Sequence, residues 1–158
     1  MQFFNKILCP TDFSKPSYRA LKVADELAKN YSSELFLVHV VVPAQLYPAT
    51  PGFVPGSPAT GGYVPPSVSA EVEGHAAESL DMTLKEKISS EVKATAKLLR
   101  GGNVAEEITR FAETSDVNCI VIGTHGFTGW RHLLLGSVTE KVVRMASCPV
   151  LTVPADHE

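Results

Sequence analysis

The sequence contains few residues from which a covalent or metal-bound scaffold could be built. Its three cysteines, Cys9, Cys119 and Cys148, are widely spaced and form no Cys-x-x-Cys pair. An odd number of such thiols argues against a disulfide framework or a zinc site. Each cysteine lies in or beside an apolar run, so we expect buried, unreactive thiols and a reducing compartment.

Long hydrophobic segments and dense positive charge are also missing. No eighteen apolar residues follow one another without proline or polar residues, and the N-terminal segment lacks the long apolar core of a signal peptide. The formal net charge is −3 and no run of lysine and arginine occurs, which argues against a nucleic-acid-binding surface. We therefore expect a cytoplasmic protein that binds neither membrane nor nucleic acid.

One long segment has no Asp, Glu, Lys or Arg at all, from residue 35 to residue 70. Within it, residues 43–66 carry seven prolines and four glycines together with three aromatic side chains. This is longer than the usual connection in a compact domain. It predicts either a flexible, polyproline-like excursion without a task, or a cover for a binding site or a surface for a partner protein. We interpret it as an insertion at about 43–70 in a single domain over residues 1–158.

Apolar runs and helical periodicities alternate along the rest of the chain. Runs typical of strands occupy residues 3–9, 35–42, about 95–100, 119–122 and 149–153. Apolar residues recur at helical spacing over residues 14–31, 72–92, 103–112 and 137–145. Ser14 and Asn103 are candidate helix N-caps. The alternation predicts an α/β fold with a single doubly wound, five-stranded parallel sheet and helices on both faces.

This fold class indicates where a ligand would bind. The strand-to-helix turns of a parallel sheet lie at its carboxyl edge, and ligands bind where the strand order reverses. If the first and fourth strands are neighbours, the turn at Asp12 meets the loop over residues 123–136. The last strand, 149–153, is expected at an edge of the sheet, where an uncharged strand can pair with a second copy of the chain.

The most informative motif is a glycine-rich loop between an apolar strand and a helix. It reads Gly123-Thr124-His125-Gly126 and, nine residues later, Gly136-Ser137-Val138-Thr139. Glycines allow tight turns and bring backbone N–H groups close to a ligand. The start of a helix offers free N–H donors and partial positive charge, which suit phosphate. The Ser137 and Thr139 hydroxyls, His125 and Arg131 could add donors or charge.

Simpler interpretations of the same residues remain open. The glycines could merely end a strand and begin a helix, and Ser137 with Glu140 reads as a capping box that competes for the same N–H groups. Asp12 could serve only as a helix cap. His39, inside an apolar run, is typical of a hydrogen-bonded core histidine. Neither GxxxxGK[ST] nor GxGxxG occurs, so no Walker A loop or dinucleotide fingerprint is indicated.

The spacing Gly-x2-Gly-x9-Gly-Ser over residues 123–137 resembles the ATP-binding signature of the universal stress protein family. The segments ILCPTDFS at 7–14, LVHV at 37–40 and CPVLTV at 148–153 resemble the same family. The resemblance covers nearly the whole chain apart from the insertion. It implies a Rossmann-like fold of the adenine nucleotide alpha-hydrolase-like kind, a homodimer, and a bound adenine nucleotide.

The resemblance also implies roles for single residues. Asp12 would contact the adenosine end, Val40 would offer backbone groups to the base, and Pro10 and Thr11 would shape the wall. The glycine loop would surround the ribose and phosphates of ATP, with or without Mg²⁺. The candidate cofactor-binding residues are Pro10, Thr11, Asp12, Val40, Ile122, Gly123, His125, Gly126, Arg131, Gly136, Ser137, Val138 and Thr139.

Phosphate binding is not hydrolysis. Rapid phosphoryl transfer requires a metal-binding carboxylate, a positioned nucleophile and compensating positive charge. Residues 123–139 contain no Asp or Glu, and Arg131 is their only permanent cation. We therefore predict an ATP-binding regulatory protein of the stress response, with at most slow hydrolysis, no catalytic residue and no metal site of its own. The alternatives are a protein-interaction or chaperone-like module that acts through residues 43–70, with nucleotide incidental, and a true nucleotide-using enzyme.

Overall fold

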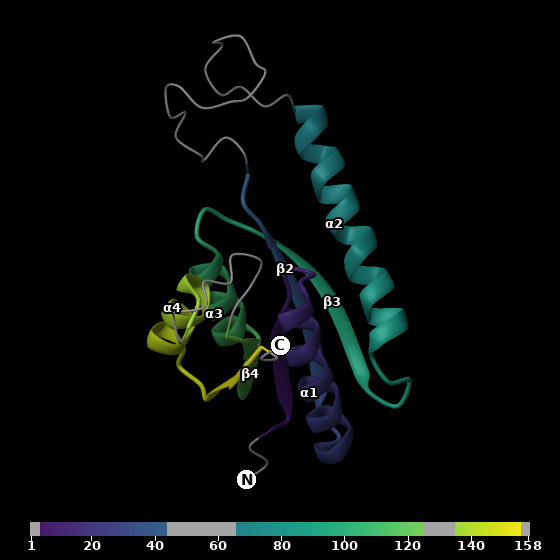
Figure 1. The fold of residues 1–158 in the computed structure, drawn as a ribbon, viewed down its shortest axis with the longest axis vertical. Helices are drawn as coiled ribbons and strands as arrows, with labels where there is room; N and C mark the ends of the chain where they lie inside the picture. Colours follow the sequence, from purple (N-terminus) through teal and green to yellow (C-terminus); the bar gives the residue numbers. More distant parts are fainter. Residues whose placement is uncertain (1–3, 44–65, 125–134, 156–158) are drawn as a thin grey trace.

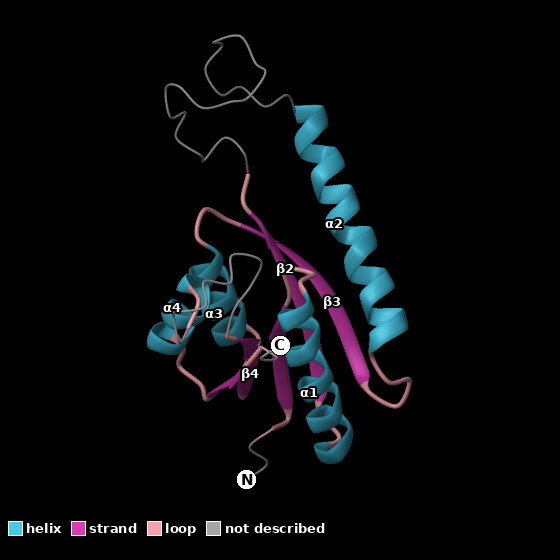
Figure 2. Cartoon of the chain, in the orientation of Figure 1, coloured by secondary structure: helices cyan, strands magenta, loops and turns pink. Residues whose placement is uncertain are grey.

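The computed structural model describes residues 4–43, 66–124 and 135–155. Over these residues, strands and helices alternate from one end to the other (Figures 1 and 2). The elements are β1 (Lys6–Pro10), α1 (Lys15–Tyr31), β2 (Glu34–Val41), α2 (Pro66–Lys87), β3 (Lys93–Arg100), α3 (Val104–Thr114), β4 (Cys119–Gly123), α4 (Ser137–Met145) and β5 (Val150–Val153).

The five strands form one all-parallel sheet in the order β3-β2-β1-β4-β5. The predicted doubly wound sheet is therefore confirmed. β1 lies in the middle, with Ile7 opposite Leu35 of β2 on one side and opposite Cys119 of β4 on the other. The first and fourth strands are neighbours, as the ligand-site prediction required. The strand order reverses between them, and β5 lies at an edge of the sheet.

Two apolar layers enclose the sheet because successive side chains of a strand point to opposite faces. Ile7 and Cys9 of β1 pack in the layer under α1 and α2, whereas Leu8 packs in the layer under α3 and α4. All three side chains are fully buried. A buried Ile or Leu contributes about 1.5–3 kcal/mol relative to an exposed one. The continuous apolar runs of the central strands follow from burial on both faces.

The helix starts follow local sequence signals. Ser14 caps α1 and accepts a hydrogen bond from the Ser17 N–H, and Asn103 caps α3 and accepts from the N–H groups of Ala105 and Glu106. Both predicted caps are confirmed. The capping box that Ser137 and Glu140 could have formed at α4 does not form, because α4 begins at Ser137 itself and its N-cap is Gly136, which has no side chain. Glu140 pairs with Arg144 instead.

The second helix ends earlier than its apolar periodicity predicted. Ile88 and Val92 lie beyond Lys87, the last residue of α2, although both still pack on the core. The turn is held by the buried Asp25 of α1, which accepts hydrogen bonds from the N–H of Ser89 at 2.9 Å and from its hydroxyl at 2.6 Å. A long-range contact therefore ends the helix, and hydrophobic spacing gives no sign of it.

Gly101 allows α3 to begin close to the end of β3. Its N–H donates to the Val41 carbonyl at 3.2 Å, and a Cβ on Gly101 would lie 2.1 Å from Oε1 of Glu107, which is largely buried. A larger residue would displace the Glu107 side chain from the first turn of α3. Because Val41 is the last residue of β2, the segment that leads into α3 is tied to the carboxyl end of β2.

Cys9 and Cys119 are buried free thiols, as expected, whereas Cys148 is a half-buried free thiol. Residues 44–65 of the expected insertion lie outside the described residues, and its last part, from Pro66, belongs to α2. Among the helices that the structure describes, none combines the length and apolar character needed to cross a bilayer.

Candidate functional site

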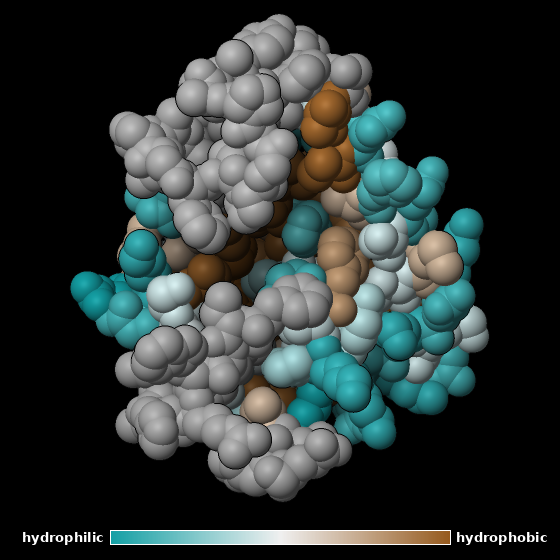
Figure 3. Space-filling model, turned by 45° about the horizontal axis from the view of Figure 1, so that its top comes forward, coloured by the Kyte–Doolittle hydropathy of each residue, from teal (hydrophilic) through white to brown (hydrophobic). Residues whose placement is uncertain are grey.

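A pocket of about 280 Å³ opens at the carboxyl edge of the sheet, between the ends of β1 and β4. This is the position where the strand order reverses. Figure 3 shows a hollow in this face whose visible floor is largely apolar. The lining residues come from the ends of β1, β2 and β4, from the turn after β1, and from the N-terminal parts of α1, α3 and α4. They are Pro10, Thr11, Asp12, Ser17, Val38, His39, Val40, Val104, Ile108, Ile122, Gly123, Gly136, Ser137, Val138 and Thr139.

The structure brings together most of the candidate residues named from the sequence. Those that line the pocket are Pro10, Thr11, Asp12, Val40, Ile122, Gly123, Gly136, Ser137, Val138 and Thr139. The other candidates, His125, Gly126 and Arg131, lie outside the described residues. Segments more than a hundred residues apart in the chain thus meet at one edge of the sheet.

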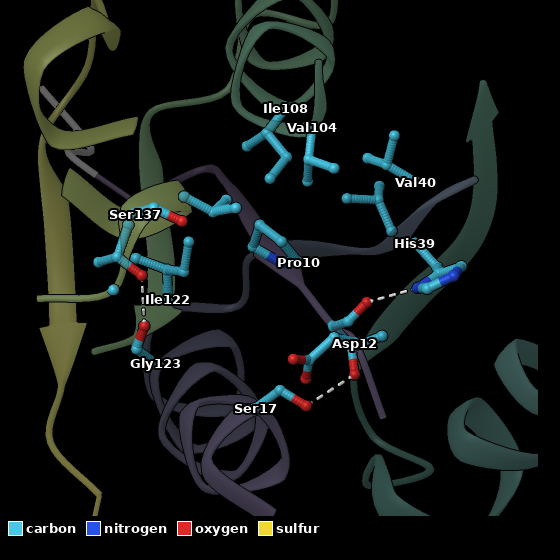
Figure 4. Close-up of a pocket in the computed structure, with 15 residues that line it drawn as sticks. Pro10, Asp12, Ser17, His39, Val40, Val104, Ile108, Ile122, Gly123 and Ser137 are labelled. Carbon is cyan, nitrogen blue, oxygen red and sulfur yellow. Dashed lines mark hydrogen bonds between the residues drawn. The ribbon is translucent and has the colours of Figure 1, made fainter. Parts of the chain in front are cut away.

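One side of the pocket is apolar. In Figure 4, Val40, Val104 and Ile108 gather at the upper side, with Pro10 below them. Val104 and Ile108 lie on the side of α3 that packs on the core. Both also line the pocket. An aliphatic slot of this kind suits a flat, apolar ring.

The turn after β1 carries the charged group of the site. The Thr11 N–H still donates to the Val38 carbonyl at 2.8 Å, and then the chain leaves the sheet. Oδ1 of Asp12 accepts from the Ser14 N–H at 3.0 Å and from the Ser14 hydroxyl at 2.5 Å. Ser14, not Asp12, caps α1. Among the lining residues that the structure describes, Asp12 is the only formally charged one.

Two residues that line this part of the pocket were not named as site residues from the sequence. Ser17 shares a hydrogen bond of 2.9 Å with the Thr11 hydroxyl. The Nδ1 of His39 lies 2.8 Å from the Thr11 carbonyl oxygen. The expectation of a hydrogen-bonded histidine is correct, but His39 is half-buried at the pocket wall rather than enclosed in the core. Its position two residues from the end of an apolar strand is the signal that could have found it.

The opposite end of the pocket is the N-terminus of α4. The Gly136 N–H donates to the Thr124 carbonyl at 2.6 Å, and the buried Thr139 hydroxyl donates to the Gly123 carbonyl at 2.7 Å. These two bonds tie the ends of the glycine loop together. The first N–H groups of a helix have no acceptor within the helix, and Gly136, the N-cap of α4, has no side chain that could accept from them. The backbone of residues 137–139 therefore offers donors and partial positive charge toward the pocket.

The geometry allows binding of a particular kind of molecule. It would have a flat ring at one end, hydrogen-bond donors in the middle and an anionic group at the other end. In the described part of the chain, no three His, Cys, Asp or Glu side chains gather as a metal site would require.

Comparison with known proteins identifies the group to which this architecture belongs. The model of the universal stress protein family matches residues 3–154. The chain belongs to the universal stress protein family. It is similar to universal stress protein MJ0531 of Methanocaldococcus jannaschii, with 39% identity over 150 residues that cover 95% of this chain and 82% of that protein.

Solved structures of universal stress proteins share the fold. The structure of MJ0577, from the same organism as MJ0531, has a TM-score of 0.74 at 27% identity and covers 99% of both chains. The structure of a universal stress protein in complex with cAMP has a TM-score of 0.61 at 19% identity, over 97% of this chain and 98% of that one. The α/β, Rossmann-like fold expected from the sequence is thus the fold of the family.

Proposed function

We propose that this universal stress protein binds an adenine nucleotide, with ATP as the first choice, and acts in the cytoplasm as a single-domain regulatory protein of the stress response. The observation that carries the proposal is the pocket itself. An aliphatic slot and the N-terminus of α4, whose N-cap Gly136 has no side chain, lie at different ends of one cavity, and Asp12 lines the wall (Figure 4). These three features suit the three parts of a nucleotide: the slot suits the base, Asp12 the sugar or the edge of the base, and the start of α4 the phosphates.

The slot formed by Val40, Val104 and Ile108 is suited to the base. A purine ring that leaves water for this slot gains about as much as a buried large apolar side chain, about 1.5–3 kcal/mol. Asp12 can only accept hydrogen bonds when ionised, so it favours the N–H and O–H donors of a nucleoside. A universal stress protein of the same fold was solved with cAMP, which supports an adenine ligand.

The start of α4 is suited to the phosphates. Its backbone N–H groups attract anions without requiring a cationic side chain. The carboxylate of Asp12 repels phosphate, and Figure 4 shows it well away from Ser137. The phosphates therefore extend toward α4, where His125, Gly126 and Arg131 are expected to add contacts.

We expect at most slow hydrolysis. Among the described lining residues, Asp12 is the only carboxylate, and Ser14 already occupies one of its oxygens. A fast phosphoryl-transfer site needs additional charged groups around the γ-phosphate. Nucleotide occupancy, with Mg²⁺ carried by the phosphates themselves, then serves as the signal to a partner protein.

We further propose that two copies pair through residues 149–153. β5 lies at an edge of the sheet, contains no charged residue, and exposes 41% of Leu151. An uncharged edge strand is an available surface for a second copy of the chain.

Isothermal titration calorimetry with ATP and Mg²⁺ tests the nucleotide proposal. We expect saturable binding, together with an adenine nucleotide released from freshly purified protein and detected by mass spectrometry. GTP, which carries a different base, and tripolyphosphate, which carries none, are the matched ligands and should bind more weakly. The absence of saturation up to millimolar ATP would reject the proposal. Phosphate release faster than about 1 s⁻¹, an ordinary enzymatic rate, would instead support an enzyme.

A further inference from the structure

The turn after β1 has a conformation that its own residues do not favour. Phe13 has a φ of 64°, in the left-handed region that residues with a Cβ rarely adopt. The other described non-glycine residues with positive φ are Ser32, the C-cap of α1, and Asp116, directly after the C-cap of α3. Left-handed residues are ordinary at helix C-termini. Phe13 precedes a helix, so something else must hold it.

Hydrogen bonds from side chains hold the turn from within. The Phe13 N–H donates to the Thr11 hydroxyl at 3.0 Å, and the Ser14 N–H donates to Asp12 Oδ1 at 3.0 Å. Both bonds join residues within the turn itself. Neither bond holds the Thr11–Asp12 peptide to another element of the fold.

His39 of β2 supplies support from outside the turn, beside the Ser17 hydroxyl of α1, which shares a hydrogen bond of 2.9 Å with the Thr11 hydroxyl. The His39 Nδ1 lies 2.8 Å from the Thr11 carbonyl oxygen, and Figure 4 shows this bond beside Asp12. A carbonyl oxygen only accepts, so Nδ1 carries the proton. The Thr11 carbonyl belongs to the same peptide plane as the Asp12 N–H, and the bond therefore fixes the direction in which the chain enters Asp12.

The His39 ring also contacts the far side of the turn. Its centroid lies 4.6 Å from that of Phe13, with the rings tilted by 35°. His39 thus contacts the residues immediately before and after Asp12. It projects from β2, which pairs with β1 on one side and β3 on the other, so the support is rigid.

We propose that His39 is a positioning residue for nucleotide binding. Through its Nδ1–H and its ring, it holds the turn over Thr11–Phe13 in the disfavoured form that presents Asp12 to the nucleoside. The inference rests on the proposed nucleotide function and adds a residue to it. His39 acts through Asp12 and the backbone, and it needs no contact of its own with the ligand.

Three substitutions at position 39 distinguish the contribution of the Nδ1–H hydrogen bond to Thr11 from that of the ring contact with Phe13. His39→Asn places an amide N–H at the position of Nδ1, His39→Gln moves it one carbon farther, and His39→Phe keeps a ring without a donor. We expect the Gln and Phe variants to bind ATP about fivefold to tenfold more weakly in calorimetry, as loss of one hydrogen bond predicts, and the Asn variant to remain within about threefold of the wild type. His75→Phe, on the exposed side of α2, is the control and should bind ATP like the wild type.

Rescue by Asn is a readout that a merely structural ring contact would not produce. If His39→Asn binds as weakly as His39→Phe, or if His39→Phe binds within twofold of the wild type, the proposal is wrong. Thermal unfolding of each variant, measured in parallel, separates loss of affinity from loss of the fold.

Two measurements on the ligand-free protein test whether His39 holds the turn over Thr11–Phe13. Nitrogen-15 NMR of the neutral His39 ring should show the proton on Nδ1. Hydrogen exchange at the Phe13 and Ser14 amides should be faster in His39→Phe and unchanged in His39→Asn. A proton on Nε2, or equal exchange in all variants, would contradict the inference. Failure of the wild-type protein to bind ATP would be a different outcome, because it would reject the proposed function. The support of the turn by His39 would then be tested by the NMR and hydrogen-exchange measurements alone.

Discussion

Asp12 lines the pocket and is tied to its own turn at the same time. One carboxylate oxygen accepts two hydrogen bonds from Ser14, so the side chain is oriented before a ligand arrives. Binding then requires little further ordering of this group, which favours affinity. The charge of Asp12 is thus the feature to test at the scale of a single residue.

Asp12→Asn removes the charge and keeps the shape. Its carbonyl oxygen can still accept from Ser14, so the fold should be retained, whereas the pocket loses a charged acceptor and gains a donor. We expect ATP binding to weaken at least tenfold, because hydrogen bonds to charged groups contribute about 1.5–3 kcal/mol. Calorimetry measures the affinity, and circular dichroism checks the fold. Equal affinity in wild type and variant would exclude Asp12 as a ligand contact.

We expect the three thiols to differ in reactivity because they differ in burial. Burial raises the pKa of Cys9 to about 12 and that of Cys119 to about 11. Burial also raises the pKa of Cys148, which is only half-buried. We expect iodoacetamide at pH 8 to alkylate Cys148 first, then Cys119 and last Cys9, as mass spectrometry of peptides would show. Denatured chain should lose this order, and an early modification of Cys9 would contradict the assigned burial.

The same pKa values predict how stability depends on pH. A thiol with a raised pKa in the folded chain stabilises the fold fully below the ordinary value of 9.0 and loses that contribution as pH rises toward the folded value. Each such thiol lowers the free energy of unfolding by up to about 1.4 kcal/mol per pH unit in that window. Urea unfolding at pH 8 and pH 10 should show a smaller loss for Cys9→Ala than for the wild type. Equal losses would exclude Cys9 as a source of the dependence.

At the scale of an element, the N-terminus of α4 differs from those of α1 and α3 in the residue that serves as N-cap. Ser14 and Asn103 cap the first two of these helices, whereas Gly136 brings no side chain to α4. Gly136 has φ −66° and ψ 159°, an extended conformation that can precede a proline. Position 137 is the first helical residue, where proline fits without breaking the helix.

Ser137→Pro therefore removes one N–H donor from the pocket at little cost to the fold, and Ser137→Ala removes only the hydroxyl. If backbone amides hold the phosphates, the proline variant should bind ATP about tenfold or more weakly, while the alanine variant stays within about threefold. Titration of both variants, with melting temperatures as the fold control, measures this difference. Equal binding by the proline and alanine variants would contradict a phosphate contact at this amide.

At the scale of the whole molecule, the order of the strands places β1 in the centre and β5 at an edge. The site is built around the central strand, and the proposed dimer contact uses the edge strand. The two are linked directly, because the Thr124 N–H donates to the Val153 carbonyl at 2.9 Å and the Thr124 carbonyl accepts from Gly136.

Leu151→Glu tests the proposed pairing of two chains. Leu151 is 41% exposed at the edge, so a charge there should leave the monomer folded and repel the same residue of a second copy. Light scattering at micromolar concentration should give a dimer for the wild type and a monomer for the variant. Met82→Glu, at a residue of α2 that is 57% exposed, is the control and should remain dimeric. A monomeric wild type would overturn the assignment.

Much of the architecture is readable from the sequence because it depends on local signals. Apolar runs placed the strands, Ser14 and Asn103 marked helix starts, and the spacing from Gly123 to Ser137 indicated a loop before a helix. The neighbouring positions of Asp12 and Gly123 followed from the rule for parallel sheets once β1 and β4 were taken as neighbours.

Other features were not readable because hydrophobic spacing says which side of a helix is buried but not what it meets. Val104 and Ile108 belong equally to a core and to a pocket wall. The end of α2 depends on Asp25, more than sixty residues away in the chain. The sequence suggested that the Thr139 hydroxyl donates to a ligand. In the structure this hydroxyl donates a hydrogen bond to the Gly123 carbonyl.

The sequence alone indicated the fold class, the family and the candidate residues, since these depend on periodicity, capping and motif spacing within short stretches of chain. Tertiary structure alone decided which groups of those residues are available to a ligand. Some donors and acceptors near the pocket form hydrogen bonds within the protein over long sequence separations, as His39 does with Thr11 and Thr139 does with Gly123. The groups without such a bond are the ones that a ligand can use. No pattern along the chain encodes which groups these are, because this depends on the orientation of peptide planes that meet only after folding.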